Sequence, residues 1–216
     1  MARMSKRERL LTRHVLARGI RDPLVVAALK KVPREAFVPR GERRHAFEDR
    51  PLPIGGGQTI SQPYIVAFMV EALELRGGEK VLEIGAGSGY AAALLAEIAG
   101  EVYAVERIGE LAEKANLNLQ KAGYPNVHVR HADGTEGWAG AAPFDAILVS
   151  ANAPAVPENL KSQLKVGGRL VIPVGPSADA QDLRRVRRID EHEFAEETLA
   201  EVRFVPLIGK FGWEES

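Results

Sequence analysis

Strand-like and helix-like segments alternate between residues 80 and 175, and this alternation restricts the fold more than any other feature of the chain. Apolar, β-branched runs predict strands at 80–85, 101–106, 126–133, 144–150 and 168–175. Helical spacing of apolar residues predicts helices at 90–100, 109–123 and 157–168. Such alternation with short connections predicts a mostly parallel sheet that helices cover on both faces. We therefore expect an α/β fold.

The segments on either side of this core have a different character. Helices are expected at 5–18 and 23–31, with Asp22 as the N-cap of the second helix, and proline-punctuated loops follow them. Another helix is expected at 62–75. After residue 175 apolar and polar residues alternate, which predicts antiparallel strands added to one edge of the sheet.

We expect a single domain over residues 1–216. Its parts are N-terminal helices with a covering loop (1–60), a cofactor-binding α/β core (61–175) and antiparallel C-terminal strands (176–216). The C-terminal part contains four closely spaced arginines, namely Arg184, Arg185, Arg187 and Arg188. They could bind a polyanion, but the interpretation we favour is the charged solvent face of an edge strand.

Charge and cysteine content exclude several classes of function. Lys plus Arg and Asp plus Glu both number 29, so no net charge attracts the chain to nucleic acid. The absence of cysteine excludes disulfides, thiolate catalysis and cysteine-bound metal. The sequence has no signal-peptide pattern and no apolar run of membrane-spanning length. We expect a cytoplasmic protein that binds neither nucleic acid nor membrane.

The run "VLEIGAGSGY" places Gly85, Gly87 and Gly89 between an expected strand and an expected helix. Glycines at such a turn permit tight backbone geometry and close approach of a ligand. Glu106 follows Gly85 by 21 residues, the spacing expected of an acidic partner for a ribose diol. A dinucleotide site would have its third glycine at position 90, which is Tyr90 here. This spacing therefore disfavours a nucleotide-dependent dehydrogenase.

Glu83 precedes the first glycine by two positions, and the pattern Glu-x-Gly-x-Gly-x-Gly resembles motif I of the S-adenosylmethionine-dependent methyltransferases, whose fold is Rossmann-like and doubly wound. We expect Glu83 near the amino-acid end of that cofactor and Glu106 at its ribose. Asp133 closes a strand, where it could accept a hydrogen bond from the adenine amino group, and Gly134 leaves room for the ring. The expected cofactor-binding residues are Glu83, Gly85, Ala86, Gly87, Ser88, Gly89, Glu106, Arg107, Asp133 and Gly134.

Motifs along nearly the whole chain are similar to one family of methyltransferases. The runs "GGGQTISQPYIVAFM", "ADGTEGW" and "VRFVPLIG", with the glycine turn, resemble the bacterial and archaeal protein-L-isoaspartate O-methyltransferases over roughly residues 10 to 212. The resemblance implies methyl transfer from S-adenosyl-L-methionine, which becomes S-adenosyl-L-homocysteine, to the free α-carboxylate of L-isoaspartyl residues in damaged proteins and peptides. The methyl ester re-closes to a succinimide, and this step begins the repair.

The uncharged segment before the helix at 62 fits this chemistry. A carboxylate with a pKa of about 4 is already a nucleophile at neutral pH, so it requires orientation and desolvation and no general base. Thr59, Ile60 and Ser61 offer backbone N–H groups and hydroxyls for that purpose, and the resemblance makes Ser61 the active-site serine. Ser61 could also be the N-cap of the helix at 62. The resemblance adds Val205, Pro206 and Leu207 to the substrate pocket, although ordinary strand packing would also explain these three residues.

The chain departs from the family pattern at Asn152, which interrupts a run of alanines before Pro154, and at Ala132, where many members carry glycine. Asn152 lies where the acceptor is expected and could adjust substrate contact. One alternative is a methyltransferase acting on RNA or a small molecule, but the second proline and aromatic ring of base-methylating sites are absent after Asn152. Another is a non-catalytic module that binds the cofactor and a protein carboxyl terminus. We expect an enzyme that is a monomer and uses no metal.

Overall fold

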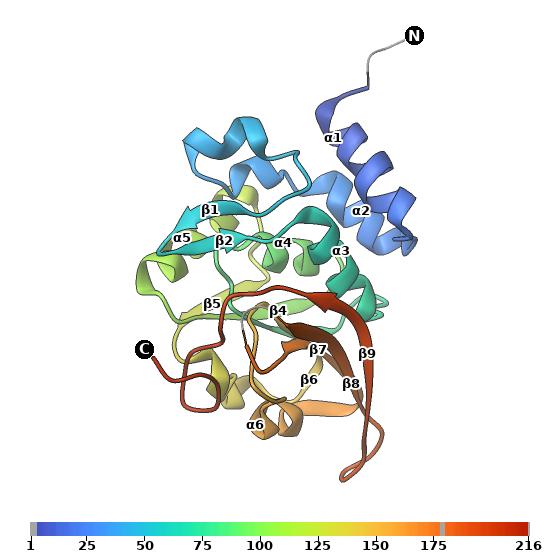
Figure 1. Ribbon diagram of the computed structural model, residues 1–216, viewed down its shortest axis with the longest axis vertical. Helices are drawn as coiled ribbons and strands as arrows, with labels where there is room; N and C mark the ends of the chain where they lie inside the picture. Colours follow the sequence, from blue (N-terminus) through green and yellow to red (C-terminus); the bar gives the residue numbers. More distant parts are fainter. Residues whose placement is uncertain (1–3, 178–179, 216) are drawn as a thin grey trace.

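The computed structural model describes residues 4–177 and 180–215, and its centre is a seven-stranded sheet (Figure 1). The strand order is β5-β4-β3-β6-β7-β8-β9. The strands are β3 (Lys80–Ile84), β4 (Glu101–Glu106), β5 (Val127–His131), β6 (Phe144–Val149), β7 (Leu164–Val174), β8 (Gln181–Arg188) and β9 (Phe194–Val202). Neighbours from β5 to β7 are parallel, and β8 and β9 are antiparallel additions. The expected α/β sheet with antiparallel C-terminal strands is confirmed.

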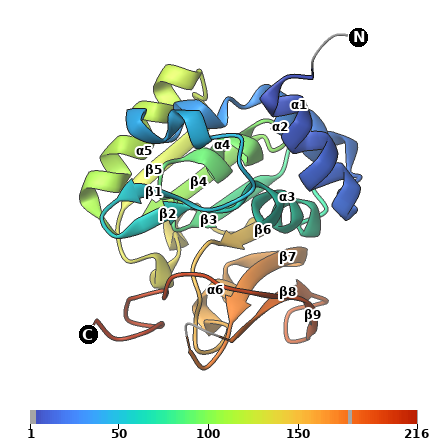
Figure 2. The same ribbon diagram turned by 45° about the horizontal axis from the view of Figure 1, so that its top comes forward.

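Helices cover both faces of this sheet, most of them on one side (Figure 2). The α-helices are α1 (Lys6–Leu10), α2 (Pro23–Lys31), α3 (Pro63–Ala72), α4 (Tyr90–Ala96), α5 (Gly109–Ala122) and α6 (Glu158–Ser162). Successive residues of β3 divide between two separate core clusters: Val81 packs with the cluster under α2 to α5, and Leu82 and Ile84 pack with the cluster that includes Leu160 of α6. Side chains of a strand alternate between faces, so a strand buried on both sides reads as one continuous apolar run.

The N-terminal helices form largely where the sequence predicts them. The segment expected as one helix at 5–18 is helical throughout, but it changes from α1 to a π-turn at Leu11–Val15 and a 3₁₀ turn at Leu16–Arg18. Asp22 caps α2 by accepting hydrogen bonds from the N–H groups of Leu24 and Val25, as expected.

Two expectations for secondary structure were wrong. The segment 52–60, which is expected to be a loop, forms a hairpin of β1 (Leu52–Gly55) and β2 (Gln58–Ile60), in which Gly56 and Gly57 have φ of 57° and 69°. Such a turn suits a tight hairpin. The helix expected at 157–168 ends at Ser162, and β7 already begins at Leu164. Leu164 is fully buried and pairs with Phe144 of β6, so tertiary pairing overrides the local helical pattern.

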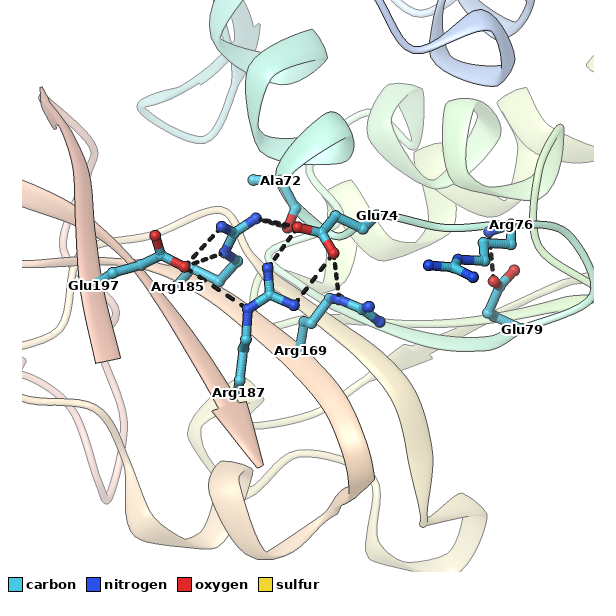
Figure 3. Close-up of polar contacts among 8 residues, drawn as sticks. All are labelled: Ala72, Glu74, Arg76, Glu79, Arg169, Arg185, Arg187 and Glu197. Atoms are coloured by element: carbon cyan, nitrogen blue, oxygen red, sulfur yellow. Dashed lines mark hydrogen bonds and ion pairs between the residues drawn. The ribbon is translucent and has the colours of Figure 1, made fainter. Parts of the chain in front are cut away.

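The arginine run lies on an interior strand, which corrects the interpretation as the solvent face of an edge strand. β8 lies between β7 and β9, and β9 is the edge. Arg185 and Arg187 share one face of β8, and with Arg169 of β7 their guanidinium groups surround the carboxylate of Glu74, which follows α3 (Figure 3). Arg185 also pairs with Glu197 of β9 at 2.7 Å. The arginines thus join the end of α3 to the sheet, a contact that no local pattern indicates.

This ion-pair network should make stability depend on acid pH. The hydrogen bond from Arg187 lowers the pKa of Glu74 below its ordinary 4.5, against the opposite effect of burial. A carboxyl with a lowered folded-state pKa stabilises the fold above its unfolded-state pKa and loses that effect as pH falls through the folded-state value. Since the Glu74 side chain is 38% exposed, Glu74→Gln should cost only about 0.5–1 kcal/mol of unfolding free energy near neutral pH.

Urea unfolding of both proteins near pH 7 and again well below pH 4.5 would measure this difference. The two proteins should differ at neutral pH and converge in acid. An equal difference at both pH values would show that the charge of Glu74 is not the cause.

Across the described ranges 4–177 and 180–215, no helix combines the length and the apolar character needed to cross a membrane.

Candidate active site

The glycine turn follows β3 and leads into α4, as the sequence predicts. Gly85, Gly87 and Gly89 all have positive φ, at 85°, 55° and 87°, a region that glycine adopts without a steric penalty. The N–H of Gly85 donates to the carbonyl of Val105, which ties the turn to β4. A side chain at Gly89 would begin 3.1 Å from Leu119 of α5. The backbone of Gly85 and Gly87 therefore lines the cleft, and Gly89 permits close packing of the turn against α5.

Glu106 ends β4 beside this turn. Its carboxylate accepts hydrogen bonds from the N–H of Gly87 at 2.8 Å and from the N–H of Ile108 at 2.9 Å. Only 7% of the residue is exposed. Arg107, the next residue, forms an ion pair with Glu215 near the C-terminus at 2.8 Å. Both Glu106 and Arg107 line the cleft, so the spacing of 21 residues read from the sequence corresponds to real proximity.

Glu83 lies behind the turn and is almost completely buried. One of its carboxylate oxygens, Oε2, is buried and has no hydrogen-bond partner among the described residues. Burial, and then the nearby charge of Glu106, raise the pKa of Glu83 well above its ordinary range. Glu83 is also among the residues that line the cleft.

These residues line a cleft of about 1040 Å³, a volume that includes its open mouth. The lining includes the glycine turn and Glu106. It also includes residues from distant parts of the chain: Thr59, Ile60 and Ser61 at the end of the hairpin, and Val205, Pro206 and Leu207 after β9. The fold thus brings together almost all of the residues predicted for cofactor and substrate.

Ser61 is not a helix N-cap. The cap position of α3 is Gln62, whose side chain accepts no capping hydrogen bond, and the helix begins at Pro63. The N–H of Tyr64 in the first turn donates instead to the carboxylate of Asp49. Ser61 is half-buried and lines both this cleft and an adjoining cavity, which Thr59, Val205 and Pro206 also line. The capping alternative therefore does not explain why a serine occupies this position.

Gly89 and Asp133 are the two predicted cofactor residues that do not line the cleft. Gly134 lines the cleft, but Asp133 lines a neighbouring cavity formed with Arg107, Gly209 and Trp213. Its carboxylate accepts hydrogen bonds from the N–H and hydroxyl of Thr135 and from the N–H of Lys210. The C-terminal segment thus lies against the carboxylate predicted to contact adenine.

Asn152 follows β6, and its backbone forms hydrogen bonds with the segment 205–207. Its N–H donates to the carbonyl of Val205, and its carbonyl accepts from the N–H of Leu207 and the indole N–H of Trp213. The Asn152 side chain is buried and does not line the cleft. Sequence reasoning also missed Tyr90, Ile108 and Ile208 as lining residues, since a single apolar side chain carries no signal of a ligand.

The sheet order, the glycine turn that follows β3 and the acidic residue that ends the adjacent strand β4 are the features of a Rossmann-like methyltransferase. The family model described as protein-L-isoaspartate(D-aspartate) O-methyltransferase matches residues 5–212. The chain belongs to this family.

Curated relatives support the assignment across the whole chain. Protein-L-isoaspartate O-methyltransferase 1 of Rhodopseudomonas palustris (strain HaA2) is 59% identical over 209 residues, which are 97% of this chain and 85% of the relative. Protein-L-isoaspartate O-methyltransferase 2 of Pelobacter propionicus is 59% identical over 208 residues, or 96% and 92%. These relatives support the isoaspartyl activity and not the alternative of an RNA or small-molecule methyltransferase.

Solved structures agree with the fold. A protein-L-isoaspartate O-methyltransferase aligns with a TM-score of 0.86 at 30% identity, covering 95% of this chain and 67% of that chain. A putative protein-L-isoaspartate O-methyltransferase from Plasmodium falciparum, solved in complex with S-adenosyl-L-homocysteine, aligns with a TM-score of 0.80 at 24% identity over 94% and 98% of the two chains. At that identity the second structure supports the fold alone.

Proposed function

We propose that this protein transfers a methyl group from S-adenosyl-L-methionine to the free α-carboxylate of L-isoaspartyl residues, and that S-adenosyl-L-homocysteine is the second product. The observation that carries the proposal is the shared cleft. The glycine turn, Glu106 and the segments 59–61 and 205–207 all line it. A methyl donor and a carboxylate acceptor would therefore meet in one cleft.

The residues present fit this cofactor. We propose Glu106 for the ribose diol and Glu83, whose buried Oε2 lacks a partner among the described residues, for the amino-acid end. Gly85 and Gly87 line the cleft and carry no side chain that would hinder close approach. The bound cofactor supplies an electrophilic methyl group on sulfur. Asp133 is proposed for the adenine amino group, which requires the carboxylate to exchange or share its hydrogen bond from Lys210.

On the acceptor side, the protein orients the substrate and excludes water. An ionised carboxylate needs no general base, and the segment from Gln58 to Gln62 carries no charged side chain. We assign the Ser61 hydroxyl the role of donating a hydrogen bond that aims the carboxylate. Ile60, which is buried, and Leu207 provide apolar walls that desolvate it.

We further propose that the protein acts as a monomeric single domain in the cytoplasm, on proteins and peptides, without a metal ion or nucleic acid. The equal numbers of basic and acidic side chains support the exclusion of nucleic acid. The chemistry supports the exclusion of a metal ion, because an ionised carboxylate requires no Lewis acid to become a nucleophile.

The test is methyl transfer to two short peptides that differ only in an L-isoaspartyl or an L-aspartyl residue. Purified protein would be incubated with methyl-labelled S-adenosylmethionine, and base-labile label would be counted as volatile methanol. We expect label on the isoaspartyl peptide alone. Equal labelling of both peptides, or none despite measurable cofactor binding, would contradict the proposal.

A further inference from the structure

Arg34 is a buried cation whose hydrogen bonds all go to main-chain carbonyls. It lies in the 3₁₀ turn Arg34–Ala36 that follows α2, and only 2% of the residue is exposed. Its Nη1 donates to the carbonyl of Ala46 at 2.7 Å, and its Nη2 donates to the carbonyls of Arg50 at 3.2 Å and Ser61 at 3.1 Å. One guanidinium group therefore connects the loop before β1 to the backbone of the proposed active-site serine.

The positive charge of Arg34 has no acidic partner in direct contact. Within the described part of the chain no ion pair joins its guanidinium to a carboxylate: Asp49, the carboxylate whose charge acts on Arg34, pairs with Arg18 instead. The Nε of Arg34 is buried without a hydrogen-bond partner. The ring of Tyr90, which lines the cleft, lies 5.9 Å from its Cζ. Charged groups are rarely buried unless they are paired, because desolvation is costly. Burial lowers the pKa of Arg34, yet a guanidinium stays protonated at neutral pH.

The position of this charge relates it to the carboxylate site. The carbonyl of Ser61 and the N–H of Gln62 belong to one peptide group, so a cation bound to the carbonyl polarises that group. Ser61 itself lines the cleft on the acceptor side. A carboxylate bound next to Ser61 would be attracted by the positive charge of Arg34, which lies beneath Ser61 and does not line the cleft. It would not form a direct ion pair that reduced its nucleophilicity.

We propose that Arg34 is a positioning residue for methyl transfer, one that fixes the backbone of Ser61 and supplies the positive potential for the substrate carboxylate. This inference rests on the proposed function. It predicts that Arg34 affects charged acceptors more than neutral ones, which a purely structural role would not do.

The test compares two peptides bound to protein saturated with S-adenosyl-L-homocysteine, so that no turnover occurs. One is the isoaspartyl peptide, and the other has the same carboxylate replaced by a primary amide. Calorimetry would measure both affinities in the wild type and in two variants. Arg34→Gln keeps two N–H donors and removes the charge. Arg34→Lys keeps the charge but loses the planar guanidinium that reaches three carbonyl groups. Arg185→Met is the matched control, since Arg185 is a largely buried arginine in the network at the far end of α3.

We expect Arg34→Gln to weaken binding of the isoaspartyl peptide about 10-fold and to change binding of the amide by less than about twofold. Arg34→Lys should retain the preference for the charged peptide, and Arg185→Met should leave both affinities as in the wild type. A thermal unfolding curve for each variant establishes that it is folded. If Arg34→Gln does not fold, Arg34→Met, which also removes the charge, takes its place: selective weakening of the isoaspartyl peptide supports the inference and equal weakening of both peptides overturns it.

Equal weakening of both peptides by Arg34→Gln would reduce Arg34 to a structural role and overturn the inference while leaving the proposed function intact. A wild type that binds neither peptide would instead contradict the proposed function. The two failures are therefore distinguishable in one experiment.

Discussion

Glu106→Ala should weaken binding of S-adenosyl-L-homocysteine by about 100-fold or more, the largest effect on cofactor affinity that we expect from a single residue. The carboxylate accepts hydrogen bonds from the N–H groups of Gly87 and Ile108. Its loss removes the proposed ribose acceptor and frees two backbone donors at the turn. Because each unsatisfied buried donor costs about 1–3 kcal/mol, the free energy of unfolding should also fall by about 2–4 kcal/mol.

Calorimetric titration with the product cofactor and thermal unfolding would measure the two effects of this substitution. Glu113→Ala, an exposed glutamate on the neighbouring helix α5, is the matched control and should change neither quantity. Unchanged cofactor affinity in a folded Glu106→Ala protein would remove Glu106 from the binding site.

Ser61→Ala should lower kcat/KM for the isoaspartyl peptide by about 100-fold, since a single donor aimed at a reacting oxygen typically contributes a factor of this order. Affinity for S-adenosyl-L-homocysteine should change by less than about twofold, because the backbone of residue 61 and its hydrogen bond from Arg34 remain. The measurement is initial-rate kinetics with both substrates varied.

Ser162→Ala is the control for the loss of a serine hydroxyl, since Ser162 lies at the end of α6 and donates only to the carbonyl of Asn159. It should leave the kinetics unchanged. Activity of Ser61→Ala equal to that of the wild type would show that the hydroxyl does not orient the carboxylate. A labelled adduct on Ser61 would show covalent catalysis, contrary to the proposed role.

Much of the fold and of the cofactor side of the cleft was predictable because the signals are local. β3, β4 and β6 are short segments dominated by apolar and β-branched residues, and the three glycines of the turn indicate its backbone geometry. The short hairpin β1–β2 was missed, because four residues and three residues of strand give too brief an alternation. The predicted end of α6 was wrong because Leu164 pairs with Phe144 of β6 and therefore belongs to strand β7.

Where a side chain finds its partner was less predictable. Arg185 and Arg187 were interpreted as solvent-facing, yet both bind Glu74, which lies more than a hundred positions away in the chain. Asp133 was expected to face an adenine ring, yet its carboxylate meets the backbone of Lys210. Arg34 drew no attention in the sequence, since an arginine beside a proline is unremarkable until its three carbonyl partners are known.

The sequence by itself therefore determined the layered α/β architecture, the glycine turn and the acidic residue opposite it. These follow from periodicity and backbone geometry, which neighbouring residues specify. Only the tertiary structure decided that 59–61 and 205–207 line one cleft and that the buried Arg34 donates a hydrogen bond to the carbonyl of Ser61. Such contacts depend on which distant segments pack together, and the hydrogen-bonding capacity of a side chain does not specify which partner it will meet.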